Sequence, residues 1–322
     1  FDGGDFKTWR RRLRKKIAEL TGFEAMPKPN ERCKLNTQTL WTREHKFGRL
    51  EKIAFRAEPG ADVVGYVCLP KKASPPYHWF ICVQGHSTGM HNSIAVDLKT
   101  NRKTIQIPGD RDFGLGCMKR GIAALCIEQR AFGEREEAEI KHRAPRRCHD
   151  AVMHALMLGR TLLGERVFDV DRAIDYLMTR DDVNPKTIGV MGNSGGGTTS
   201  LFSAALLDRL QLCMPSGYFC TFRDSIMAMY HCECNYVPNL LQFAEMADVM
   251  GLFAPRPVVI VNGKTDPIFP LHAARSEFRR LKKMYRAAGA AEHCHHVIGG
   301  GGHRFYAKPA WDAMWREIRK LA

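Results

Sequence analysis

Six short apolar runs recur along the chain, and segments with helical periodicity separate them. The runs occupy residues 78–84, 122–128, 187–192, 210–215, 257–263 and 292–298. Between two of them, residues 169–178 repeat apolar side chains at i, i+3, i+4 and i+7, a spacing that marks one buried helix face: Val170, Ala173, Ile174 and Leu177. Short apolar strands that alternate with helices are typical of α/β proteins. The pattern therefore predicts a mostly parallel central sheet with helices on both faces.

The N-terminal part of the chain has a different pattern. Residues 49–58 and 62–70 are both strand-like, and the turn residues 59–61 join them, which predicts an antiparallel hairpin. The chain has 322 residues, of which 44% are hydrophobic, and this is enough for one large core. We expect residues 1–44 to form a helical extension and residues 45–322 to form a single α/β domain.

The charge of the chain is strongly basic but scattered. The formal net charge is +15, and the only dense basic block is residues 10–16. If this segment is helical, the apolar side chains around the block fall on one face: Phe6, Trp9, Leu13, Ile17 and Leu20. The block is then the solvated face of an amphipathic helix, and no specific nucleic-acid partner is expected.

Composition also bears on the compartment. No apolar run reaches the roughly 18 residues of a membrane span, and the N-terminus lacks the apolar region of a secretory signal. The chain does not begin with Met, so a removed leader stays open. The eleven cysteines are an odd number, and several lie inside apolar runs. Free thiols in a reducing compartment explain this better than a disulfide framework, so we expect a cytoplasmic protein.

The segment GVMGNSGGGTTS, residues 189–200, lies where a predicted strand is followed by a predicted helix. It has no lysine for a phosphate-binding Walker loop, and its glycines do not fit the dinucleotide fingerprint. It does fit G-x-S-x-G, with Gly192, Ser194 and Gly196. A nucleophile on such a sharp turn needs neighbours without side chains, so we predict Ser194 as a catalytic nucleophile.

A serine nucleophile requires a base and an acid. His303 follows four glycines in the loop after the last predicted strand, whereas other histidines nearby lie within that strand. Asp266 follows the strand at 257–263, and Asp248 precedes that strand and so lies on its wrong side. The chain order Ser194, Asp266, His303 is the order expected of a triad on an α/β sheet of this kind.

Acyl transfer also needs donors for the developing oxyanion. One donor is expected from the backbone N–H of Gly195, directly after the nucleophile. The second is expected from the loop after the strand at 78–84, where Gly85 permits a turn and His86 supplies its N–H.

Residues 216–254 are too long for an ordinary connection and are rich in aromatic residues and methionine. We predict a partial lid whose side chains line the substrate pocket: Phe219, Phe222, Met229 and Tyr230. The same segment contains His231, Cys232 and Cys234, which raise the question of a zinc site. No CxxC pair occurs in the chain, so we expect neither a metal nor another cofactor.

Taken together, these motifs resemble the α/β-hydrolases, and more narrowly the bacterial esterases near the dienelactone hydrolases, acetyl xylan esterases and prolyl-oligopeptidase-type hydrolases. The resemblance covers about residues 45–320 and rests on QGHS, EQRAFGERE, LGRTLLGERVFDVDRAIDYL, GNSGGG, APRPVVIVNGKTDPIFP and GGHRF. It implies the α/β-hydrolase fold and a serine esterase that acts on a small-molecule or carbohydrate ester with a small acyl group. Two positions depart from the pattern: Gln84, where many relatives have His, and Gly195, where the deacetylase branch carries Gln.

Other functions stay open at this point. A serine peptidase or a dienelactone-type hydrolase would use the same triad, although the chain is too short to add the large propeller domain of oligopeptidases. A basic binding protein on a hydrolase-like scaffold would use Arg10 to Lys16 as its contact surface. The oligomeric state is also open, and an oligomer is compatible with the sequence.

Overall fold

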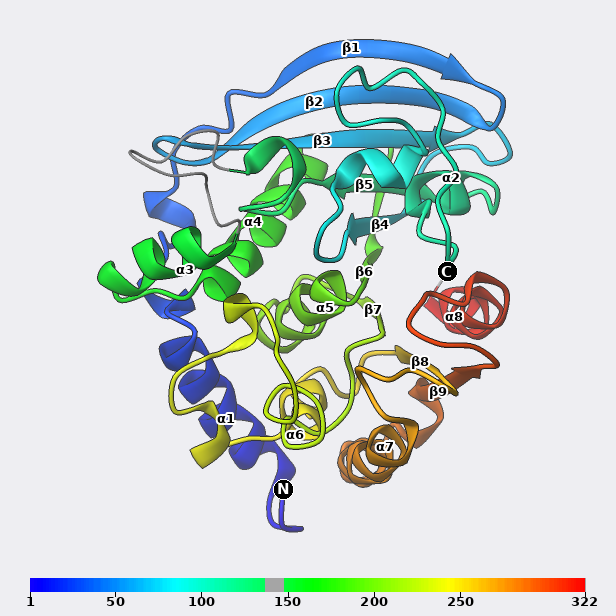
Figure 1. The fold of residues 1–322 in the computed structure, drawn as a ribbon. Coiled ribbons are helices and arrows are strands. Elements are labelled where there is room, and N and C mark those ends of the chain that lie inside the picture. The colour runs from blue at the N-terminus through cyan, green and yellow to red at the C-terminus, as the bar shows by residue number, and fades with distance from the viewer. Residues whose placement is uncertain (137–147, 322) are drawn as a thin grey trace.

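The computed structural model describes residues 1–136 and 148–321. Its central sheet has nine strands in the order β1-β2-β3-β5-β4-β6-β7-β8-β9 (Figure 1). The strands are β1 (Gln38–His45), β2 (Gly48–Glu58), β3 (Ala61–Pro70), β4 (Tyr77–Val83), β5 (Ala123–Ile127), β6 (Val183–Asn193), β7 (Leu212–Ser216), β8 (Val258–Gly263) and β9 (Cys294–Gly299). The α-helices are α1 (Phe6–Leu20), α2 (Phe113–Met118), α3 (Cys148–Met157), α4 (Leu162–Leu177), α5 (Gly195–Leu206), α6 (Met246–Gly251), α7 (Leu271–Ala287) and α8 (Ala307–Leu321).

The sheet confirms the predicted fold class. The strands from β5 through β4, β6, β7, β8 and β9 are parallel, and each corresponds to one of the six apolar runs. The predicted hairpin is β2 and β3, which pair antiparallel from Gly48 and Pro70 to Glu58 and Ala61. In Figure 1, β1, β2 and β3 curve over one end of the sheet.

The sequence analysis missed strand β1. It pairs antiparallel with β2, and none of its eight residues is buried, so it lacks the apolar alternation that marks a strand. Because β1 runs from Gln38 to His45, the predicted boundary between residues 44 and 45 falls inside a strand of the sheet.

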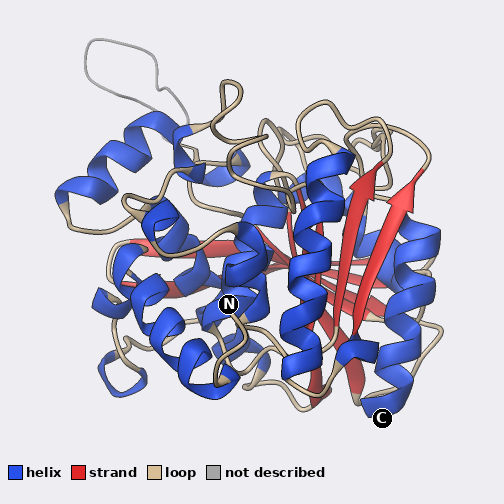
Figure 2. Ribbon diagram, turned by 90° about the horizontal axis from the view of Figure 1, so that it is seen from below, coloured by secondary structure: helices blue, strands red, loops and turns tan. Residues whose placement is uncertain are grey.

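Helices cover both faces of the sheet, as Figure 2 shows. On β4, Ile81 faces the core that α1, α4, α5, α6 and α7 share, whereas Phe80 faces the core shared with α2 and α8. Apolar residues of adjacent strand positions therefore enter two different cores, as expected for a buried parallel sheet. Among the helices of the described residues, none combines the length and the apolar character needed to cross a membrane.

Helix α1 packs against the main core. Phe6, Leu13 and Ile17 are buried there, on the predicted apolar face. Two residues of the basic block also turn toward the protein, since Arg10 Nε and Arg14 Nη2 donate to the carbonyl of Leu252 at 2.8 and 3.1 Å. The N-terminal segment is therefore part of the folded core, and its basic face is partly used within the chain.

A buried ion network joins the loop after β5 to helix α4. Arg130 donates to both oxygens of Asp169 at 3.0 Å and to Glu58 of β2 at 2.8 Å. Arg135 Nη1 adds a bond of 2.6 Å to Asp169. Burial acts to raise the pKa of Asp169, but Arg130 and Arg135 outweigh it and hold that pKa below its ordinary value. The network fixes the position of residues 130–135 on the sheet.

Removing the charge of Asp169 is expected to destabilise the fold strongly. Asp169→Asn removes the carboxylate that Arg135 contacts and one of the three that Arg130 contacts, so the charge of a largely buried network is left unbalanced. Breaking a buried ion pair in this way costs about 3–5 kcal/mol of unfolding free energy. The matched control is Asp62→Asn, because Asp62 pairs with Arg56 on the surface with 54% of its side chain exposed. That change is expected to cost less than about 1 kcal/mol. Urea denaturation of both variants measures the difference, and equal losses would contradict a stabilising role of the network. Because the folded-state pKa of Asp169 is lowered, this stability is present above the unfolded pKa and is lost as the pH falls through the folded pKa.

Candidate active site

Ser194 lies on a strained turn between β6 and α5. Its φ and ψ are 58° and −122°, and its N–H donates to the carbonyl of Ser216 at 2.9 Å. The flanking glycines are required by space: a Cβ on Gly192 would lie 2.5 Å from the carbonyl oxygen of Val83, and one on Gly196 would lie 2.1 Å from it. The G-x-S-x-G spacing therefore has the structural reason that the sequence analysis gave it.

His303 and Asp266 form a hydrogen-bonded pair at the carboxyl edge of the sheet. His303 Nδ1 lies 2.7 Å from Asp266 Oδ2, and the Asp266 side chain is fully buried. Asp266 Oδ1 accepts the N–H groups of Ile268 and Phe269 at 2.9 and 3.2 Å, which orients the carboxylate. The ring of Phe269 stacks on His303 with centroids 5.7 Å apart.

The pair and Ser194 meet on either side of one short segment, Ser216–Gly217. The carbonyl of Ser216 receives the N–H of Ser194, and a Cβ on Gly217 would lie 3.0 Å from His303 Cε1. Gly217 has φ +54°, and its missing side chain leaves the room that the imidazole occupies. The three predicted residues thus follow the ends of β6, β8 and β9, with Ser194 and His303 against neighbouring residues of one segment.

The competing acid and histidines are used elsewhere. Asp248 caps α6 and pairs with Arg280 at 2.8 Å. His293 and His295 both contact the buried Glu317, at 2.5 and 2.8 Å. His296 contacts Asn262, and burial lowers its pKa to about 4. These side chains pack within the domain, as their position in or before a strand indicated.

The loop after β4 passes close to the turn that holds Ser194. A Cβ on Gly85 would lie 2.8 Å from the carbonyl of Asn193, and the imidazole of His86 lies 2.7 Å from the place of a Gly195 Cβ. Gln84 anchors the loop from below, because its Nε2 donates to Ser93 Oγ at 2.7 Å and to the carbonyl of Arg111 at 2.8 Å. The two predicted oxyanion donors, Gly195 and His86, therefore sit next to each other.

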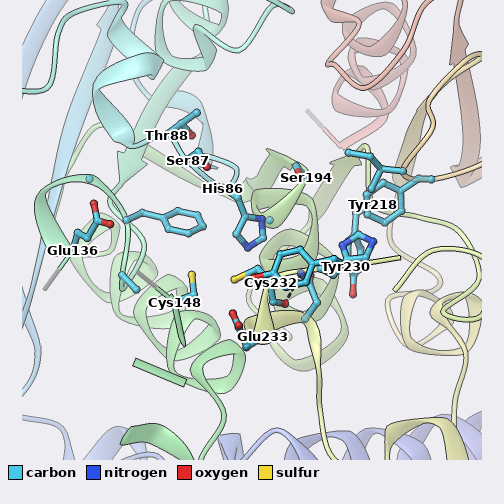
Figure 3. A pocket seen from close by; sticks show the side chains of 18 of the residues that line it. His86, Ser87, Thr88, Glu136, Cys148, Ser194, Tyr218, Tyr230, Cys232 and Glu233 are labelled. Carbon is cyan, nitrogen blue, oxygen red and sulfur yellow. Dashed lines mark hydrogen bonds between the residues drawn. The ribbon is translucent and has the colours of Figure 1, made fainter. Parts of the chain in front are cut away.

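A cavity of about 590 Å³ opens at Ser194 (Figure 3). The loop after β4, the loop after β5 and the insertion between β7 and β8 line it, and its members include Ser194, Thr88, Phe132, Tyr218, Met229, Tyr230 and Phe269. Met229 and Tyr230 thus lie where they were predicted, with 37% and 88% of their surfaces exposed. The contribution of the loop after β5 was not predicted from the sequence.

Phe219 and Phe222 do not line this cavity, contrary to the sequence-based prediction. They are 0% and 3% exposed and belong to the main hydrophobic core. Asn262 Nδ2 donates to the carbonyl of Phe219 at 3.0 Å, and Glu245 accepts the N–H of Phe222 at 3.0 Å. The start of the insertion is therefore anchored inside the fold. Apart from Tyr218, the insertion reaches the cavity through residues between 229 and 235.

A buried carboxyl supports the cavity from beneath. Glu128 follows β5, and its carboxyl accepts the N–H groups of Met90 and Glu134 at 3.0 and 3.1 Å. Burial raises the pKa of Glu128 to about 8. The group ties the loop after β4 to the loop after β5, and both loops contribute to the cavity wall.

Three cysteines and one histidine converge in the same wall. His86, Cys148, Cys232 and Cys234 place one side-chain nitrogen or sulfur each within 4.8 Å of one another. The sequence analysis considered His231 with Cys232 and Cys234, but His231 lies outside the cluster and contacts Ser225 at 3.3 Å. Sequence reasoning missed the cluster because His86 and Cys148 are far along the chain from Cys232 and Cys234, and no local spacing motif connects them.

Comparison with known proteins agrees with this architecture. The chain is 25% identical over 283 residues to YtaP of Bacillus subtilis (strain 168), which is provisionally assigned as a hydrolase; the match covers 85% of this chain and 88% of the relative. A Bacteroides fragilis NCTC 9343 structure, provisionally assigned as an acetyl xylan esterase, matches with a TM-score of 0.74 and 17% identity over 95% of this chain and 76% of that chain. A glucuronoyl esterase from Solibacter usitatus matches with a TM-score of 0.67 and 14% identity over 98% of this chain and 94% of that chain.

Because the two solved structures are only 17% and 14% identical to this chain, their similarity supports the fold alone. The sequence model of the Abhydrolase family matches residues 1–299, which is most of the chain, and so shows common ancestry. With its nine-stranded, mostly parallel sheet and its serine turn after β6, the chain belongs to the Abhydrolase family.

Proposed function

We propose that this protein is a serine esterase that hydrolyses carboxylic esters with small acyl groups through an acyl-enzyme intermediate. The observation that carries the proposal is the bond of 2.7 Å between His303 and the buried Asp266, beside the strained turn of Ser194. A serine on such a turn, a histidine and an orienting acid are the parts that nucleophilic acyl transfer needs.

In the proposed reaction, His303 Nε2 accepts the proton of Ser194 Oγ while the oxygen attacks the ester carbonyl carbon. Collapse of the tetrahedral intermediate breaks the bond to the alcohol, and His303 returns the proton to the leaving oxygen. Water then attacks the acyl-enzyme with the same histidine as base, and the acid product leaves. Asp266 holds Nδ1 protonated and stabilises the imidazolium in both steps.

The negative charge of each tetrahedral intermediate is assigned to the N–H groups of Gly195 and His86. Gly195 is the first residue of α5, so its N–H has no partner within the helix and lies at the positive end of the helix dipole. The close packing of the His86 ring over Gly195 supports the pairing of these donors. Each preorganised donor contributes about 3 to 4 kcal/mol to the stabilisation of the transition state.

The substrate class follows from the cavity and from the relatives. The cavity is limited in size, and its wall combines aromatic side chains with polar ones such as Thr88, His91 and Glu233. Both structural neighbours are named for esters that contain a carbohydrate: in acetyl xylan the carbohydrate is the alcohol and the acyl group is small, whereas in a glucuronoyl ester the carbohydrate is the acyl part. A polar alcohol such as a carbohydrate, esterified with a small acyl group, fits this combination best.

A binding protein that uses the basic block is the second candidate, and the structure weakens it. Arg10 and Arg14 both contact Asp208 in addition to the Leu252 carbonyl, so their charge is partly neutralised within the chain. A peptidase or a dienelactone-type hydrolase would use the same site and differs only in substrate, which the assays below separate.

Removal of the proposed nucleophile is expected to abolish turnover. Ser194→Ala should lower kcat for p-nitrophenyl acetate at least about 10³-fold, by analogy with other triads, and should prevent labelling by a fluorophosphonate. The matched control is Ser203→Ala, a buried serine of the same helix with no hydrogen-bond partner for its Oγ among the described residues. The control should keep both activities, and a Ser194→Ala variant with more than a tenth of normal turnover would exclude Ser194 as the nucleophile.

Asp266→Asn tests the acid. The amide can still accept from Ile268 and Phe269, so the loop should fold, but it can hold His303 in the wrong tautomer. We expect kcat to fall by about 10²- to 10⁴-fold. Asp248→Asn is matched in burial, since both residues are 5% exposed. It should cost less than about tenfold in kcat, because Asp248 caps α6 and pairs with Arg280 and the N-terminal ammonium, away from the candidate triad. Thermal melts run in parallel detect unfolding, and near-normal turnover of a folded Asp266→Asn would assign the acid to another loop.

Met229 and Phe222 separate the cavity from the core. Met229→Ala is expected to change the ratio of kcat/KM values among acetate, butyrate and octanoate esters by more than about twofold, with little loss of stability. Phe222→Ala is expected to destabilise the fold by about 3–5 kcal/mol because it empties a core position, with unchanged ratios. The two variants compared by ester series and by denaturation test the placement, and the reverse outcome would contradict it.

A further inference from the structure

We propose that His86, Cys148, Cys232 and Cys234 bind one Zn²⁺ ion in the wall of the cavity, which the sequence analysis did not expect. The four residues come from three separate segments: the loop after β4, the first turn of α3, and the insertion between β7 and β8. Figure 3 shows the side chains of Cys148 and Cys232 close to the His86 ring. Random placement rarely brings three thiols and an imidazole to one point, so the convergence calls for a ligand.

The geometry fits a tetrahedral ion. His86 Nε2 lies 3.0 Å from Cys234 Sγ, the two sulfurs of Cys232 and Cys234 lie 3.4 Å apart, and no pair of the four atoms exceeds 4.8 Å. Zinc binds sulfur at about 2.3 Å and nitrogen at about 2.0 Å, which places tetrahedral ligands roughly 3.5–3.8 Å from one another. Small rotations of the side chains therefore bring all four atoms to one centre. Three thiolates and one imidazole are a ligand set that selects zinc among the common divalent metals.

The surroundings balance the charge of such a site. Zn²⁺ with three thiolates and a neutral imidazole carries a net charge of −1, because binding releases the three thiol protons. Arg166 lies beside it, is 2% exposed, and donates from Nη2 to Cys148 Sγ at 3.2 Å. No carboxylate among the described residues forms an ion pair with Arg166, and its other bonds go to the carbonyl of Arg130. A buried cation without a carboxylate needs a nearby anion, and the zinc–thiolate centre supplies it.

The site is structural. Four protein ligands complete the coordination sphere, so no position is left for water or substrate. Cys148 and Cys234 are buried with Phe132 and Leu162 in a small apolar cluster, which shields the thiolates from solvent. The ion joins the insertion and α3 to the loop that holds His86. One part of this inference rests on the proposed function: the ion would also fix the loop whose His86 N–H is the proposed oxyanion donor.

The experiment measures the metal itself. The full chain is produced without a histidine tag, dialysed, and analysed for bound zinc by inductively coupled plasma mass spectrometry. We expect about one zinc per chain, with sulfur at about 2.3 Å from the metal in X-ray absorption spectra. Cys232→Ser and Cys148→Ser should each retain less than about a tenth of an ion per chain, because a lost ligand opens the sphere. The matched control is Cys33→Ser, which is half-buried like Cys232 but lies far along the chain, and it should keep its zinc.

A disulfide is the rival explanation of the close sulfurs. Titration of the denatured protein with a thiol reagent separates the two: the zinc site leaves all eleven cysteines reactive, and a disulfide leaves two fewer. Zinc-free protein that takes up no added Zn²⁺ or Co²⁺, or retention of the ion in both ligand variants, would overturn the proposal. If a variant does not fold, Co²⁺ added to the native chain still decides, because tetrahedral cobalt thiolates absorb in the visible range. Esterase activity is not needed for any of these readings, so failure of the proposed function is detected separately.

Discussion

The close approach of two strand ends governs the architecture of the catalytic edge. Gly192 and Gly196 lie so near to the carbonyl oxygen of Val83 that no side chain fits between them. This contact allows β6 to turn sharply into α5 beside the end of β4, with Ser194 in a strained conformation. The loop that contains His86 crosses the start of α5, where its ring packs against Gly195. The positions of Ser194, the start of α5 and the neighbouring loop are thus linked by one steric requirement.

Two arginine side chains hold a second loop of the site in place. Arg166 belongs to α4 and Arg130 to the loop after β5, and their hydrogen bonds hold this loop against the helix. Arg130 donates to the carboxylate of Asp169, and Arg166 donates to the carbonyl of Arg130. The same loop presents Phe132 to the cavity, where the Arg166 guanidinium lies 4.4 Å from the centre of its ring. The run EQRAFGERE, residues 128–136, therefore supports one wall of the cavity with a mostly buried first half, in which Glu128, Gln129 and Phe132 are at most 4% exposed.

Local patterns explain why so much could be predicted from the sequence. The apolar runs predicted the parallel strands, and the candidate triad residues were chosen because each follows a strand by a few residues, where the carboxyl edge must lie. The failures have a common cause in long-range packing. Strand β1 is too exposed to show an apolar pattern. The aromatic rings of Phe219 and Phe222 pack in the main core and do not line the cavity. The cluster of His86 with three cysteines was missed because its members are distant in the chain.

The insertion between β7 and β8 is anchored to the fold at two places, with an exposed span between them. Its first residues hang on Asn262 and Glu245, and further along Asn235 accepts a buried hydroxyl hydrogen bond from Thr198 at 3.0 Å. Between these anchors Met227, Met229 and Tyr230 are exposed and carry little of the fold's stability. Sequence drift in this span would leave folding nearly untouched while it reshapes the entrance to the cavity. Homologues of this chain can therefore diverge in the ligands that the cavity admits without first acquiring compensating changes in the core.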